Sequence, residues 1–167
     1  AIRADAAEAV EQADDVAPTA KRPARCLTQG DREAQLGSLR EAEMLYRKAK
    51  GHAMDIIDFW AKAEASIGDA KRSLAGCEGA QYESLFRAVK DAEEALEREE
   101  PAEAAGLAAS VPEHVGNLSQ TGEGAEETLD EAKRAVEAAK GIDDADFAVR
   151  LAQADEALAS GDFSLAR

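Results

Sequence analysis

The side chains best suited to chemistry are two histidines, His52 and His114, which lie far apart in the sequence. A histidine can act as a general base or hold a metal, but either role needs partner side chains close by. The chain has no Glu-x-x-His pair of the di-iron type, no glycine-rich phosphate loop and no nucleophile elbow. We therefore predict no catalytic, cofactor-binding or metal-binding site, and we interpret both histidines as structural or solvated residues.

Carboxylates gather in two stretches that could bind a cation or a basic partner. Seven acids and one arginine lie between Asp91 and Glu103, and a second group runs from Glu123 to Glu131. No Asp-x-Asp-x-Asp-Gly calcium loop accompanies either stretch. Because charge runs on helices usually serve solubility, we favour a solvated helical face over a cation site.

Cys26 and Cys77 are the two cysteines of the chain. A disulfide would require their Cα atoms to lie within about 7 Å of each other. If the helix predicted between them is continuous, it is a rod of roughly 69 Å, and a short connection cannot bring Cys26 back along it. We therefore favour two thiols that are not paired with each other, and the cysteines do not specify a cellular compartment.

Asn117, the only asparagine, begins the N-glycosylation sequon Asn117-Leu118-Ser119. It falls in the segment 111–124, whose one proline and three glycines predict an exposed loop. An exposed position is what a glycosylation acceptor needs, although the motif is short and has meaning only in a secreted protein. Asn117 is therefore a candidate glycosylation site.

The elements that must carry these residues are helices. Alanine and glutamate account for 39 and 21 of the 167 residues, and aromatic residues for only 4%. Both are strong helix formers and poor strand formers, which argues against an all-β fold.

The formal net charge is −15, and the half after residue 84 has 20 acidic and 8 basic residues. This charge disfavours nucleic acid and anionic membranes as partners, and no apolar run is long enough to span a bilayer.

Apolar residues recur every three to four positions, which is the period of an amphipathic helix. The pattern predicts helices over approximately 2–17, 31–76, 80–110 with a kink near Pro101, and 125–159, with an irregular connection over 18–30 and a loop over 111–124. In the last helix the apolar phase slips after Asp143, which indicates either a stutter or a short break at Gly141. The longest helix has an unbroken seam of alternating bulky and small residues: Leu39, Ala42, Tyr46, Ala49, Ala53, Ile56, Trp60, Ala63, Ile67, Ala70, Leu74 and Cys77. We predict one all-α domain, an elongated antiparallel bundle of three long helices plus a shorter N-terminal helix.

Leu45, Ile57 and Phe59 lie beside this seam. They would form a partner-binding patch if exposed, but a bundle helix needs a wider apolar stripe than the seam alone, so we favour packing against a third helix.

Two stretches that begin at Gly37 and Gly161 match the tetratricopeptide pattern loosely. The two glycines are 124 residues apart, which is not a multiple of the repeat length, and no helix is expected before the first match, so we do not predict such repeats.

The stretches DAEEALEREEPAEAAGLAAS and GAEETLDEAKRAVEAAKG, together with the acidic balance and a start at Ala1 rather than Met, resemble the glutamic acid/alanine-rich surface glycoproteins of African trypanosomes. The resemblance lies in composition along the whole chain and transfers no functional residue. It implies a processed, non-enzymatic ectodomain of a lipid-anchored coat protein that forms a steric, acidic barrier, with neighbouring coat molecules or a host protein as partners. The anchor would lie beyond Arg167. A surface receptor for a host macromolecule and an intracellular helical scaffold are the alternatives.

Overall fold

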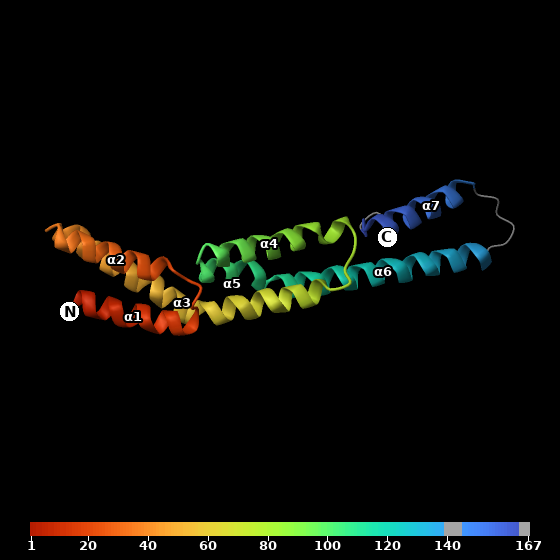
Figure 1. Cartoon of the computed structure of the whole chain (residues 1–167). Coiled ribbons are helices and arrows are strands. Elements are labelled where there is room, and N and C mark those ends of the chain that lie inside the picture. The colour runs from red at the N-terminus through yellow and green to blue at the C-terminus, as the bar shows by residue number, and fades with distance from the viewer. Residues whose placement is uncertain (139–144, 164–167) are drawn as a thin grey trace. The chain divides into compact units, whose positions relative to one another are not determined.

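The computed structural model describes residues 1–138 and 145–163 of the chain. Every regular element in these residues is helical, which confirms the all-α class. The elements follow in the order α1 (Ile2–Val16), α2 (Arg22–Gln35), α3 (Leu39–Leu74), the 3-10 helix η1 (Ala80–Tyr82), α4 (Glu83–Glu97), α5 (Pro101–Ala109), α6 (Val111–Ala138) and α7 (Ala145–Ser160). Figure 1 labels the seven α-helices.

The single domain expected from the length is divided into two compact units. Unit 1 comprises residues 1–71 and 88–109, and unit 2 comprises residues 72–87 and 110–167. The two units hardly differ in net charge: unit 1 has 20 acidic and 13 basic residues, and unit 2 has 15 and 7, so their formal charges are −7 and −8. Any difference between them must therefore come from packing and from how the charges are used.

Helix α3 carries the long apolar seam that the spacing predicts. It passes through Gly51 without interruption and ends at Leu74. All the seam positions between the two ends of the seam are buried, which confirms the predicted pattern. The ends themselves are not buried: Leu39, the first residue of α3, is 71% exposed, and Cys77, which follows the helix, is half-buried.

The segment before α3 differs from the prediction. Residues 22–35 form α2, where we expected an irregular connection and the start of the long helix. Pro23 lies in the first turn of α2, where a missing N–H costs no helical hydrogen bond. Gly30 is buried within α2 because the ring of Tyr46 lies against it, and a Cβ there would lie 2.7 Å from Tyr46 Cε1. The chain then turns at Gly37, whose φ is +84°. Helix α2 therefore precedes the first tetratricopeptide-like stretch, where we expected no helix.

The core of unit 1 is built mainly from alanine, which lets helix backbones approach closely. A first cluster joins α1 and α3 through Ala6, Ala42, Tyr46 and Ala49, and three residues of α2 pack against it: Cys26, Leu27 and Ala34. A second cluster joins α1, the connection to α2, and α3: Ala9, Ala13, Ala17, Ala20, Ala53, Ile56 and Trp60. Ile57 and Leu96 pack against the second cluster, which connects α4 to the same core.

The predicted helix over 80–110 is also corrected, because it is two helices rather than one kinked helix. Helix α4 ends at Glu97, and the chain reverses direction before α5 begins at Pro101 (Figure 1). Glu99 has a left-handed φ of +60°. The N–H groups of Glu99 and Glu100 donate to the carbonyls of Leu96 and Ala95, which is the hydrogen-bond pattern that closes a helix C-terminus.

In unit 2, the predicted loop over 111–124 is wrong, since α6 is continuous from Val111 to Ala138. Pro112 is the second residue of α6, where proline is tolerated. Gly122 is buried inside the helix because the ring of Phe163 lies over it, and a Cβ there would lie 3.0 Å from Phe163 Cζ. The glycines that suggested a loop therefore belong to a helix.

Helix α7 packs against α6 instead of continuing it, so the range 125–159 holds parts of two helices, which agrees with a break and not with a stutter in one helix. Ala125 of α6 and Ala157 of α7 are buried together, with Leu158 and Phe163 against them. Figure 1 shows α7 running back along α6. One straight helix could not bury these two alanines against each other. Residues 139–144 of the predicted helix lie outside the described part.

Candidate functional site

A groove of about 640 Å³ lies on unit 1. It is formed by α3, by α4 with the turn after it, and by the connection between α1 and α2. Small-molecule sites commonly have volumes of roughly 300 to 1,000 Å³, so the groove has the size of a ligand site. All of its lining residues belong to unit 1: Thr19, Ala20, Trp60, Glu64, Ile67, Gly68, Lys71, Glu93, Leu96, Glu97 and Glu99.

The floor of the groove is apolar. Trp60 and Ile67 belong to the buried seam of α3, and Leu96 reaches it from α4. The Trp60 indole donates its Nε1–H to Glu64 Oε1 at 3.1 Å, one turn further along α3. This bond satisfies the one polar group of the buried ring, which would otherwise lose its hydrogen bond to water.

Carboxylates dominate the rim. Glu64, Glu93, Glu97 and Glu99 line the groove, and Lys71 is its only cation. Lys71 is paired with Glu93, so its charge is compensated within the rim. The Glu97 carboxylate makes no hydrogen bond or ion pair with the residues that the structure describes. The groove therefore combines an apolar floor with uncompensated negative charge.

Glu99 has a structural task at the edge of the groove. Its two carboxylate oxygens accept hydrogen bonds from the backbone N–H groups of Lys21, at 2.8 Å, and Arg22, at 2.6 Å. Lys21 is the N-cap residue of α2 and makes no side-chain capping bond of its own. A carboxylate at this helix end satisfies free N–H groups and interacts favourably with the helix dipole. Glu99 thus caps α2 from a distant part of the chain.

The same corner of unit 1 holds a second set of charges. Arg22 Nη1 lies 3.6 Å from Glu100 Oε1, and Arg98 Nε lies 2.9 Å from Glu100 Oε2. The hydrogen bond from Arg98 lowers the pKa of Glu100 below its ordinary value. Glu103 lies 3.7 Å from Arg98. Much of the acidic stretch 91–103 is therefore engaged in ion pairs or capping, in keeping with the solvated-face interpretation.

A third polar cluster joins α1, α2 and α3. Arg3 donates from Nε and Nη2 to the two carboxylate oxygens of Asp31, at 2.6 and 2.8 Å, and the Tyr46 hydroxyl donates to Asp31 Oδ1 at 2.8 Å. These bonds lower the pKa of Asp31, while burial and the bond to Asp31 raise the pKa of Tyr46. Asp31, which we expected as the first residue of the long helix, is instead the centre of this cluster.

The two histidines belong to different units. His52 is half-buried on α3, and burial together with the positive charge of Arg22 lowers its pKa. His114 is exposed on α6, and its Nδ1–H donates to the carbonyl of Ser110 at 2.7 Å.

The cysteines are free thiols in the structure. Cys26 is half-buried against the first core cluster of unit 1. Cys77, in unit 2, donates its S–H to the carbonyl of Ser73, with the two atoms 3.5 Å apart. In the part of the chain that the structure describes, no three His, Cys, Asp or Glu side chains gather as they would around a metal ion. The second acidic stretch, 123–131, lies along α6.

The three residues beside the seam are all half-buried. Ile57 packs against the second core cluster, in line with the alternative that these residues meet a neighbouring helix. The most exposed apolar side chains lie instead at the turn between α2 and α3, where Leu36 is 76% and Leu39 71% exposed. This pair is not evident from the sequence, because the periodicity predicts one continuous helix through both residues.

Asn117 is exposed, as predicted, but it lies within α6 and not in a loop. The Thr121 hydroxyl donates to the carbonyl of Asn117 at 2.8 Å. In residues 1–138 and 145–163, no helix is both long and apolar enough to cross a membrane. Comparisons of the chain with protein-family models, curated proteins and solved structures find no match.

Proposed function

We propose that this protein is a non-enzymatic surface coat protein whose helical ectodomain forms a steric, acidic barrier at a cell surface. In this proposal the helices stand as an elongated antiparallel bundle, held to the membrane by a lipid anchor outside this chain. Its neighbours are other copies of the same protein. The compositional resemblance to trypanosome surface glycoproteins motivates the cell-surface location.

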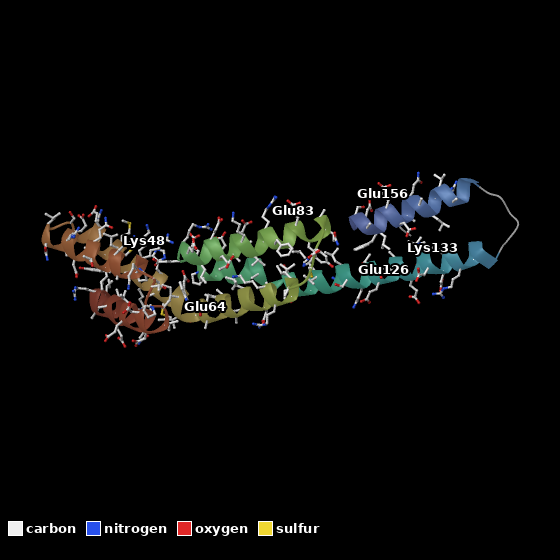
Figure 2. All side chains as sticks on the ribbon, turned by 45° about the vertical axis from the view of Figure 1, so that its right-hand side comes forward. Lys48, Glu64, Glu83, Glu126, Lys133 and Glu156 are labelled. Atoms are coloured by element: carbon white, nitrogen blue, oxygen red, sulfur yellow. The ribbon has the colours of Figure 1, made fainter. Side chains whose placement is uncertain are left out.

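The observation that carries the proposal is where the charge lies. Among the described residues no polar or charged side chain is buried, although the chain has a formal charge of −15. Figure 2 shows charged side chains, among them Glu64, Glu126 and Glu156, projecting from the helices. Like charges that stay solvated keep closely spaced molecules apart and soluble, which is what a dense layer requires.

The chemistry of the carboxylates supports a non-enzymatic role. General acid–base catalysis needs groups that are brought together and desolvated so that their pKa values move toward the working pH. Here Glu99 caps a helix, and Glu93 and Glu100 pair with cations at the surface. The lowered pKa of Glu100 moves away from neutral pH, which suits a permanent charge and not a proton shuttle.

Two measurements on native material test the proposal. Intact mass should exceed that of the polypeptide by a glycan or an anchor remnant, and a membrane-impermeant biotin reagent should label the protein on unbroken cells. The exposed Asn117 is the candidate acceptor for the glycan. A protein of unmodified mass that is labelled only after lysis would be an intracellular scaffold, and the proposal would be wrong.

A surface receptor is the second candidate, and the exposed pair Leu36 and Leu39 favours it. Two large apolar side chains at one turn are a suitable contact for a host macromolecule. Copy number separates the two candidates, because a steric barrier needs close packing over the whole surface and a receptor does not. Quantitative mass spectrometry of the cell surface should therefore find the protein among the most abundant components if it is a coat protein.

A further inference from the structure

We propose that the groove of unit 1 binds a linear aliphatic polyamine, a chain of methylene groups that carries several ammonium charges. The proposal goes beyond a barrier role because it assigns a ligand class to a defined site. It follows from the charge of the rim, from the character of the floor and from the arrangement of the carboxylates around it.

The charge of the rim requires a cation. Four glutamates and one lysine line the groove, and the lysine is already paired with Glu93. Glu97 has no partner among the described residues, and Glu64 is engaged only by the neutral Trp60 indole N–H. A positively charged ligand would supply the missing partners.

The floor requires a ligand with an apolar part. Trp60 and Ile67 are only 9% and 7% exposed and Leu96 is half-buried, so the apolar surface left open to the groove is small, and a hydrated ion would leave it uncovered. Methylene groups remove such a surface from water. A polyamine offers both kinds of group along one chain.

The groove carboxylates come from separate elements, which favours a ligand with several charges over a single point charge. Glu64 comes from α3, Glu97 from the end of α4 and Glu99 from the turn that follows. No three potential metal ligands converge in the described residues. Separate anionic positions around an apolar floor match separate ammonium groups joined by an aliphatic chain. The volume of about 640 Å³ is that of a small-molecule site.

The only tryptophan of the chain, Trp60, lines the groove and therefore reports binding directly. Titration of the full chain with spermidine should change the tryptophan fluorescence with a saturable, one-to-one profile. An uncharged diol of similar length and equal concentrations of KCl should not reproduce the change. Raised ionic strength should weaken the binding, because exposed charges are screened. A fluorescence response that does not saturate, or that the diol reproduces, would overturn the proposal.

Matched variants locate the site. Glu97→Gln removes the unpartnered rim charge and should weaken spermidine binding about fivefold, the weight of one exposed ion pair. Glu94→Gln removes the same charge from α4 outside the groove, where Glu94 pairs with Lys90, and should leave the affinity nearly unchanged. Neither residue contributes to the core, so both variants should fold, which circular dichroism checks. Equal weakening in the two variants would show non-specific attraction to an acidic surface and would contradict the groove.

Discussion

Units 1 and 2 carry nearly the same charge but hold their helices together differently. In unit 1, carboxylates of one helix bind to groups of another: Asp31 receives Arg3 and Tyr46, and Glu99 caps α2. In unit 2, α6 and α7 meet through two buried alanines and the ring of Phe163 over Gly122, with an exposed ion pair between Lys133 and Asp155. Charge therefore joins helices in both units, but in unit 1 several donors converge on single carboxylates, whereas the described α6–α7 contact of unit 2 combines the Lys133–Asp155 pair with a small apolar seam.

Equal helix content therefore does not imply equal local stability. Helices that share two core clusters and converging polar contacts should open together, whereas a pair joined by a small seam should open more readily. Substitutions in each unit test this inference.

The largest effect is expected for Trp60→Ala in unit 1. Trp60 is 9% exposed and belongs to the second core cluster, so truncation should cost about 3–5 kcal/mol of the free energy of unfolding. Urea denaturation followed by circular dichroism measures the change, and Trp60→Phe, which keeps most of the apolar volume, serves as the control. A loss below about 0.5 kcal/mol would place the ring outside the core and remove the distinction between the units.

Two buried glycines provide the next test, one in each unit. A Cβ on Gly30 would lie 2.7 Å from Tyr46 Cε1, and the Tyr46 hydroxyl is held by Asp31. Gly30→Ala should therefore cost about 1–3 kcal/mol, as overpacking does. Gly122→Ala should cost less, because its nearest contact would be 3.0 Å from Phe163, a half-buried ring. Chemical denaturation of both variants compares them, and an equal or larger cost at Gly122 would contradict the comparison.

Glycines with free space around them should behave in the opposite way, because alanine there should raise the free energy of unfolding. Gly51 in α3 and Gly116 in α6 both lie within helices, and a methyl group added at either would meet no atom within 4 Å. Alanine at either site should stabilise the helix by about 0.5–1 kcal/mol, because glycine loses more backbone entropy on folding. Thermal unfolding measures the gain. If Gly116→Ala raises the melting temperature and Gly51→Ala does not, unit 2 is the part that limits stability.

The smallest change is expected in how stability depends on pH in the acid range. Because the pKa of Asp31 is lowered in the folded chain, its stabilising contribution is complete above the ordinary aspartate pKa and is lost as the pH falls through the lowered folded value. Asp31→Asn should therefore flatten the acidic limb of the stability profile, as urea midpoints measured from neutral pH down through the acid range would show. Asp155→Asn in unit 2, whose partner is the exposed Lys133, is the control and should change this limb less. If both variants flatten the acidic limb equally, the Asp31 cluster does not join the helices more strongly than the exposed ion pair of unit 2 does.

The periodicity of the apolar residues is sufficient to predict the class of the fold and the buried seam of α3, but not the residue at which α3 begins. The seam from Ala42 to Leu74 is buried because each residue type already suits a helix interface, so the pattern and the packing agree. Helix ends were harder to predict, because proline can start a helix as well as end one, and glycine can lie inside a helix as well as in a loop. Pro23 and Pro112 stand in first turns, where they start helices, and were interpreted as breakers.

Gly30 and Gly122 wrongly suggest loops for a different reason. A residue without a side chain is needed at each position because an aromatic ring from another part of the chain occupies the space, and the local sequence does not show that contact. The groove could not be predicted for the same reason, since its residues come from segments that lie far apart in the sequence, from Thr19 to Glu99. The composition did indicate acidic helix faces, but not which carboxylates would be left without a partner.

Glu99 has a consequence for how this sequence can change through evolution. Its backbone has a left-handed φ, which favours glycine, while its side chain caps α2, which glycine could not do. A chain with glycine at position 99 would relax the turn and leave the N-terminus of α2 uncapped. The loss can be compensated at position 21, where serine or aspartate would provide a local cap in place of Lys21. Homologous chains should therefore show covariation between these two positions, with a carboxylate at one or a capping residue at the other.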